Sequence, residues 1–157
     1  MEFFPWINNI EKLKETLAQL EAKAPALWGK MDAQQMVEHL NLVLEISNGT
    51  LDVVIYTPEK YIEKSQAFLM SQEPLPRNFV AKFIPEEPIT HKNADLKSAV
   101  EVFLNSAEKH QKYWREKDAE NRNHPVFGNL NKTMWDCVHN KHITHHFIQF
   151  SLIEDLN

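Results

Sequence analysis

The segment NKHITHHFIQF, residues 140–150, contains three histidines whose imidazole nitrogens could bind a metal ion. His142 and His146 are four residues apart, so on a helix they would lie one turn above each other, with about 5–6 Å between their Cβ atoms. That separation allows two imidazoles to reach one ion. His145 would be rotated by about 100° from His146 and is expected to flank the site. His139 lies near the same face one turn earlier, and spacing alone leaves it open as a competing ligand.

A catalytic metal centre needs more than this pair, because such centres have three protein ligands and a fourth position open to water or substrate. His39 is the preferred third ligand, since it belongs to a second predicted helix beside an apolar stripe that includes Met36, Leu40 and Val43. Helical bundles build metal sites from inward side chains of facing helices. Against this, a single histidine on an apolar stripe is more often a hydrogen-bonded core residue. Exposed helices also carry histidines four apart, so the spacing favours a metal site without requiring one.

Other polar residues near these histidines are candidates for supporting roles. Gln149 and His145 would orient a ligand or line the pocket wall, and His124 in the preceding loop could reach a substrate. Glu38 and Glu45 are the acidic residues nearest in sequence to the proposed ligand of the second helix. Glu38 would be turned about 100° away from that ligand, and Glu45 lies further along the helix and points elsewhere. The sequence therefore offers no obvious general base.

The helices that would carry these histidines have clear boundary signals. Asp32 can accept a free N–H of a first helical turn, and Gln35 stands at the position that completes a capping box. Gly49 is placed to close this helix at its C-terminus. The last helix is expected to begin with Thr133 as its cap. Its inward face is polar where a core helix would be apolar, and it reads Trp135, Val138, His142, His146 and Gln149.

The rest of the chain supplies the other parts of a helical bundle. Further helices are predicted at residues 7–24, 57–70 (with Thr57 as its cap) and 93–117. Extended or loop structure is predicted at residues 51–57, 72–93 and 121–131. Roles in packing are expected for Trp28, Trp114 and Trp135, and packing or surface roles for His91 and His110. We therefore predict one all-α domain, residues 1–157, built as a four-helix bundle with long connecting loops.

The composition excludes several classes of function. The chain has 157 residues, of which 43% are hydrophobic and 25% charged, as in an ordinary globular domain, and its three glycines are few for a β-barrel. A net charge of -5 without a basic block argues against nucleic-acid binding, and no apolar run is long enough to span a membrane. Cys137 is the only cysteine, and acidic Glu2 does not suit a secretory signal. We therefore expect a cytoplasmic protein.

Three motifs occur in order between Trp28 and Phe150: LWGKMDAQQMVEHL, NHPVFGNLNKTMW and HITHHFIQF. With their patterns WGKM…HL, HPxFG and HxxHHxxQF, they resemble an uncharacterised family within the DinB/YfiT-like superfamily of metal-dependent helical bundles. The resemblance implies a four-helix bundle whose metal site takes one histidine from the second helix and two, four apart, from the last. Carried over to this chain, the implied ligands are His39, His142 and His146.

The resemblance also implies a class of reaction. Characterised members of that superfamily include thiol S-transferases and a thiol-dependent isomerase that use bacillithiol, mycothiol or similar small thiols. It thus implies a metal-dependent enzyme in which a bound thiol loses its proton and becomes a nucleophile. Zinc is the first expected ion, with nickel or another transition metal as the alternative. A metal-dependent hydrolase and a non-catalytic metal-binding or stress-response module remain open, and a homodimer is compatible with each.

Overall fold

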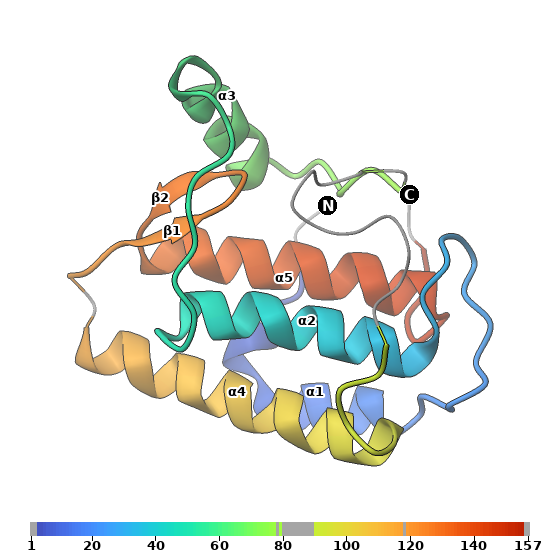
Figure 1. The fold of residues 1–157 in the computed structure, drawn as a ribbon. Helices are drawn as coiled ribbons and strands as arrows, with labels where there is room; N and C mark the ends of the chain where they lie inside the picture. The colour runs from blue at the N-terminus through green and yellow to red at the C-terminus, as the bar shows by residue number, and fades with distance from the viewer. Residues whose placement is uncertain (1–2, 78, 80–89, 118, 156–157) are drawn as a thin grey trace.

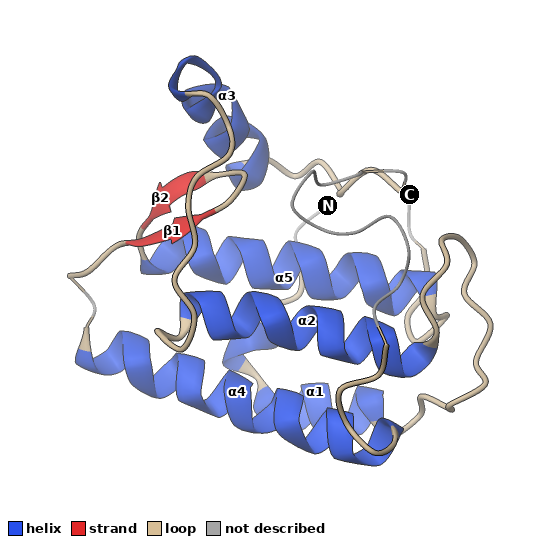
Figure 2. Ribbon diagram, in the orientation of Figure 1, coloured by secondary structure: helices blue, strands red, loops and turns tan. Residues whose placement is uncertain are grey.

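The computed structural model describes residues 3–77, 79, 90–117 and 119–155, and these are mostly helical (Figures 1 and 2). The elements in chain order are η1 (Trp6–Asn8), α1 (Ile10–Leu17), α2 (Ala33–Ser47), α3 (Glu59–Met70), α4 (Leu96–Glu116), β1 (Arg122–His124), β2 (Gly128–Leu130) and α5 (Lys132–Gln149). In Figure 1, α2 lies between α4 and α5, and α3 projects above the small hairpin. None of the helices in the described ranges is both long and apolar enough to cross a membrane. The prediction of a mainly helical protein is confirmed.

The helices begin where side chains can satisfy free backbone N–H groups. Asp32 and Gln35 form the predicted capping box at the start of α2, with both bonds at 2.8 Å. The prediction that Thr133 caps the last helix is wrong, because Asn131 has the extended backbone of a cap and its side chain accepts from Met134 N. α3 likewise begins one residue later than predicted, after Pro58, and has no side-chain cap.

The first helix is shorter than the apolar periodicity indicates. α1 ends at Leu17, and the chain then tightens through i→i+3 hydrogen bonds from Gln19 N to Thr16 O and from Leu20 N to Leu17 O. Leu20 is still buried, so its side chain reaches the core from a turn instead of from a helix. The periodic spacing of leucines therefore predicted the burial correctly and the helix end incorrectly.

Residues 121–131, predicted as a loop, contain a β-hairpin, so the protein is not purely α-helical. β1 and β2 pair antiparallel, with Arg122 opposite Leu130 and His124 opposite Gly128. Gly128 has φ +85°, the left-handed conformation that a three-residue hairpin connection commonly requires. Strands of three residues are too short to show the alternation by which strands are recognised. The sequence patterns therefore did not predict the sheet.

Two apolar clusters meet along α5. One lies among α1, α2, α4 and α5, and the other lies under the hairpin and α3. On α5 itself, Trp135 and Val138 belong to the second cluster, whereas Ile143 and Phe147 belong to the first. The polar residues between these pairs, at positions 139–142, therefore fall at the boundary between two apolar regions.

A buried lysine fastens α3 to α5. Lys141 is only 2% exposed, and its Nζ donates hydrogen bonds to the carbonyls of Phe68, Ser71 and Glu73 at 2.9, 3.1 and 2.6 Å. These carbonyls belong to the last turn of α3 and the residues after it, where a cation also interacts favourably with the helix dipole. This contact holds the chain that follows α3 beside the histidine-rich helix.

Candidate metal centre

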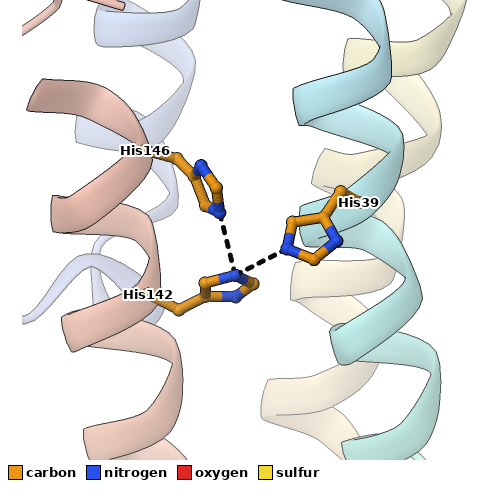
Figure 3. Close-up of side chains that lie close together, drawn as sticks. All are labelled: His39, His142 and His146. Carbon is orange, nitrogen blue, oxygen red and sulfur yellow. Dashed lines mark hydrogen bonds between the residues drawn. The ribbon is translucent and has the colours of Figure 1, made fainter. Parts of the chain in front are cut away.

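Three imidazole nitrogens converge between α2 and α5 (Figure 3). His39 Nε2 lies 2.9 Å from His142 Nε2, and His146 Nε2 lies 3.0 Å from that same nitrogen. One possible ligand atom from each ring lies within 4.8 Å of the others. The structure thus brings together the three histidines that the sequence analysis favoured, and we call them the histidine cluster.

The antiparallel arrangement of α2 and α5 makes this convergence possible. The colours of Figure 1 show the two helices running in opposite directions. In Figure 3, His142 and His146 of α5 both point toward His39 of α2. His39 meets both rings nearly edge to face, with centroids 4.8 Å from His142 and 5.0 Å from His146. A single residue from α2 therefore faces the pair from α5.

Gln149 sets the orientation of one ring in the cluster. His146 Nδ1 lies 2.7 Å from Gln149 Oε1, while Gln149 Nε2 donates to the carbonyl of Trp28 at 2.8 Å. Because the amide nitrogen of Gln149 is used as a donor, its oxygen accepts from His146 Nδ1–H, which leaves the lone pair on His146 Nε2. The other ring nitrogen of a metal-bound histidine commonly donates in this way. The structure thus places Gln149, predicted from the sequence as a supporting residue, in contact with His146.

Burial keeps the cluster neutral. Burial, together with the nearby His145, lowers the pKa of His39 to about 4. For His142 and His146, burial is again the main cause and holds each pKa well below its usual value, with the neighbouring histidines adding to the effect. Neutral imidazole is the form that binds metal ions. Near neutral pH the three rings are therefore in the protonation state of ligands.

The donor set fits a small divalent ion. In a tetrahedral zinc site with Zn–N bonds of about 2.0–2.1 Å, neighbouring nitrogens lie about 3.3–3.4 Å apart. The two short contacts in the histidine cluster would have to lengthen by about 0.4 Å to reach that spacing. Small rotations of the imidazole rings would be enough for such a change. Among the described residues the cluster contains histidines alone and no carboxylate, a composition that suits zinc and other transition metals better than magnesium or calcium.

His145 flanks the cluster, as its helical position predicts. Its ring packs edge-on against His146 and Trp28, with centroid distances of 4.9 and 5.3 Å, and it hydrogen-bonds to the backbone of Leu75. Burial lowers the pKa of His145, although the Leu75 hydrogen bond opposes this. With Trp28, Leu75 and Arg77 it lines a cavity of about 270 Å³. His145 therefore forms part of a wall between this cavity and the histidine cluster.

His124 takes a different place from the one its loop position suggested. Its Nδ1 accepts hydrogen bonds from the backbone N–H groups of Val126 and Phe127 at 3.0 and 3.1 Å, and its ring packs against Trp135. Burial lowers the pKa of His124 to about 3. The structure thus assigns His124 to the hairpin turn and separates it from the histidine cluster.

His139, the competing ligand, faces away from the cluster. Its Nε2 lies 2.7 Å from Ser47 Oγ, and the same oxygen lies 2.8 Å from His110 Nδ1. This buried polar group was not among the features predicted from the sequence, although Ser47 continues the stripe of Met36, Leu40 and Val43 on α2. The one signal that could have revealed this polar group is a serine, Ser47, on an otherwise apolar stripe eight residues after His39.

The nearby acidic side chains are occupied elsewhere. Burial acts to raise the pKa of Glu38, but hydrogen bonds from the backbone of Lys92 and Asn93 and from Gln34 lower it overall. The Glu38 carboxylate therefore fixes the segment before α4 to α2. Glu45 accepts a hydrogen bond from Asn41 on its own helix. Neither carboxylate joins the histidine cluster.

Comparison with known proteins places this site in a family but gives no activity. A family model described as "Protein of unknown function (DUF1569)" matches residues 6–152, which include the whole histidine cluster and Gln149. No curated protein and no solved structure matches the chain.

Proposed function

The chain belongs to the DUF1569 family of proteins of unknown function, and we propose from the geometry of its site that it is a metal-dependent enzyme. In this proposal His39, His142 and His146 bind one divalent ion. The convergence of their three Nε2 atoms, each on a neutral ring, carries the proposal. We also propose that α1, α2, α4 and α5 form a DinB-like four-helix bundle, since α2 packs on both α4 and α5 and α1 packs on α4.

Three histidine ligands leave a coordination position for a reacting group. Zinc is the first candidate, and nickel or another transition metal is the alternative, because imidazole binds several of these ions. When bound there, the ion would lower the pKa of a thiol or water in its open position. Gln149 would hold the His146 ring in place, while Trp28 and His145 would shield that side of the cluster from solvent.

We propose that the reacting group is a low-molecular-weight thiol and that the reaction is S-transfer to an electrophile. With a chloroaromatic acceptor, a carbon–sulfur bond would form, the carbon–chlorine bond would break, chloride would leave, and the thiol proton would pass to solvent. This reaction needs no general base on the protein once the thiol is ionised. The engagement of Glu38 with Lys92 and Asn93 supports it over hydrolysis, which is usually assisted by a carboxylate near the ion.

Metal analysis of untagged protein is the first test. The proposal expects one equivalent of a divalent transition metal, loss of that metal in His142→Ala, and its retention in His91→Ala. His91 is a suitable control because it is an exposed histidine that pairs with Asp32 on the surface. Protein without bound metal, or a His142→Ala variant that retains a full equivalent, would contradict the proposal.

Activity measurements then separate the three functions. Metal-loaded protein is assayed with small thiols and a chloroaromatic acceptor, and separately with ester and amide substrates in the absence of thiol. Metal- and thiol-dependent release of chloride is the expected result. Metal-dependent hydrolysis without thiol would favour a hydrolase, while metal-dependent thermal stability without turnover would favour a non-catalytic metal-binding module.

A further inference from the structure

A second group of buried and partly buried polar side chains lies close to the histidine cluster but shares no residue with it. It consists of Ser47, His110, Asp136 and His139, from α2, α4 and α5. Ser47 is fully buried, and both histidines are 2% exposed. We call this group the serine network. Its burial leaves no route by which a substrate could reach the Ser47 hydroxyl, so the network is not a second catalytic site.

The hydrogen bonds of the serine network run in one direction. Asp136 also accepts from Lys132 at 2.6 Å, and its carboxylate lies 3.2 Å from His110 Nε2. Because a carboxylate can only accept, His110 Nε2 carries a proton and, on a neutral ring, His110 Nδ1 is an acceptor. Ser47 therefore shares its one hydroxyl proton between His110 Nδ1 at 2.8 Å and the Leu44 carbonyl of its own helix at 3.0 Å, and it accepts Nε2–H from His139 at 2.7 Å. His110 Nδ1 and His139 Nε2–H both keep their hydrogen bonds only while Ser47 lies between the two histidines.

This network makes a second contact between the two helices that carry the histidine cluster. On α2, Ser47 lies eight residues after His39, whereas on α5 His139 lies three residues before His142. The pairs His39–His142 and Ser47–His139 therefore cross the same antiparallel interface at two separate heights. Two contacts at different heights prevent the helices from sliding or rotating past each other.

Apolar packing alone fixes such an interface weakly. Burial of apolar surface is non-directional, so leucine and valine contacts tolerate small shifts of one helix along another. Hydrogen bonds weaken steeply when distance or angle departs from the optimum, and a buried polar group can thereby select one register. A metal site needs its ligands held to within about 0.5 Å. The serine network supplies this directional restraint about two turns from His39.

We infer that Ser47 is a positioning residue for the histidine cluster: through His139 it sets the register in which His39 of α2 meets His142 and His146 of α5. This inference rests on the metal site proposed above, although Ser47 itself touches none of the three proposed ligands. The network also extends the restraint to α4, because His110 Nδ1 accepts a hydrogen bond from the Ser47 hydroxyl.

The test compares Ser47→Ala with Thr16→Val. Thr16 is a matched control, since its buried hydroxyl donates only to Lys12 O of its own helix, and α1 carries no member of the histidine cluster. Metal-free samples of each variant are titrated with Co²⁺, which gives a dissociation constant and visible absorption bands. In addition, the imidazole ¹⁵N chemical shifts of the metal-free proteins report the contact between His39 and His142 without any metal.

We expect the Co²⁺ dissociation constant of Ser47→Ala to rise about tenfold, with altered absorption bands and shifted imidazole ¹⁵N resonances for the histidine cluster. Thr16→Val should match the wild type in all three measurements. Should Ser47→Ala fail to fold, His139→Gln and His139→Leu replace it. The glutamine keeps an N–H donor for Ser47 and should bind Co²⁺ more tightly than the leucine variant.

Two outcomes separate this inference from the proposed function. Folded Ser47→Ala with wild-type Co²⁺ affinity and wild-type imidazole shifts, or equal affinities for the two His139 variants, would overturn the positioning role. Wild-type protein that takes up no Co²⁺ would overturn the metal function alone. The imidazole shifts of metal-free Ser47→Ala then decide the positioning role: a change in the His39 and His142 resonances supports it, and no change refutes it.

Discussion

Gln149 Oε1 lies 2.7 Å from His146 Nδ1, and the Nε2–H of the same amide donates a hydrogen bond to the carbonyl of Trp28. One side chain thus links a proposed metal ligand to the loop before α2. The link fixes both the tautomer of His146 and the direction of its free lone pair.

Replacing Gln149 with leucine should weaken metal binding more than it weakens the fold. The His146 ring would lose its hydrogen bond to the Gln149 amide oxygen, and affinity for Zn²⁺ should fall by about 10- to 100-fold. Competition against a chromophoric chelator measures this constant. Gln66→Leu is the control, because Gln66 likewise donates to a loop carbonyl, that of Phe127, but has no hydrogen bond to a histidine among the described residues. Equal losses of affinity in the two variants would disprove the orienting role of Gln149.

Gly29 should be required for the same link. It has φ +79°, and a Cβ at this position would lie 2.9 Å from Gln149 Nε2. Gly29→Ala should therefore cost about 1–2 kcal/mol of unfolding free energy and should also reduce Zn²⁺ affinity by displacing Gln149. Urea unfolding and chelator competition measure the two effects.

Gly49→Ala provides a matched control for that substitution. Gly49 has φ +84°, and a Cβ there would lie 2.8 Å from the Tyr113 ring, away from the histidine cluster. The control should lose a similar amount of stability and keep wild-type Zn²⁺ affinity. If both alanine variants bind Zn²⁺ equally well, the close approach of Gly29 to Gln149 has no bearing on the metal site.

The histidine cluster was predictable because helical geometry translates sequence spacing directly into position. His142 and His146 had to share a face of α5, and the capping box at Asp32 fixed where α2 begins and hence where His39 points. Gln149 could be placed for the same reason, as the next residue on that face. Local rules placed each of these residues on its helix face, whereas the family resemblance singled out His39, His142 and His146 as a set over His139.

Other features could not be predicted because their strands are too short for a periodic signal, because distant segments meet, or because two neighbouring residues compete as a cap. The hairpin of residues 122–130 is held by its turn, in which His124 accepts two backbone N–H groups, and three-residue strands carry no periodic signal. The serine network joins residues 47, 110 and 139, which are far apart in sequence, and helical spacing does not say which polar residues on different helices will meet. Thr133 failed as a cap because Asn131, two residues earlier, met the same requirement.

Glu38→Gln should test whether the carboxylate beside His39 has a chemical or a structural role. Glu38 accepts from the N–H groups of Lys92 and Asn93, so the neutral amide should loosen that segment and cost about 1 kcal/mol of stability. Metal content and thiol-transfer rate should stay within a few-fold of the wild type. A loss of turnover by a factor of about 100 or more with full metal content would instead identify Glu38 as a general base.

The unfolding free energy of the metal-free protein should fall as the pH is lowered from about 6.5 towards 3. Burial lowers the folded-state pKa of His124 to about 3, whereas a histidine in the unfolded chain titrates near its usual value of about 6.5. Between these two values the unfolded state binds the extra proton, so acid favours unfolding. One such group contributes a slope of at most about 1.4 kcal/mol per pH unit, with stability increasing as pH rises and constant above about pH 7.

His124→Asn should remove that part of the slope while keeping the hairpin. An asparagine Oδ1 can accept the Val126 N–H in the same two-residue relationship, as in an Asx turn, but it does not titrate. Urea unfolding of both proteins in a chelator at pH 7, 6, 5 and 4 measures the difference. The variant should lose some stability at pH 7 and approach the wild type as the pH falls. Only the wild type loses unfolding free energy in acid through residue 124, because His124 stays neutral when folded and is protonated when unfolded. Parallel curves for the two proteins would mean that the pKa of His124 is the same in the folded and unfolded states, contrary to its burial against Trp135.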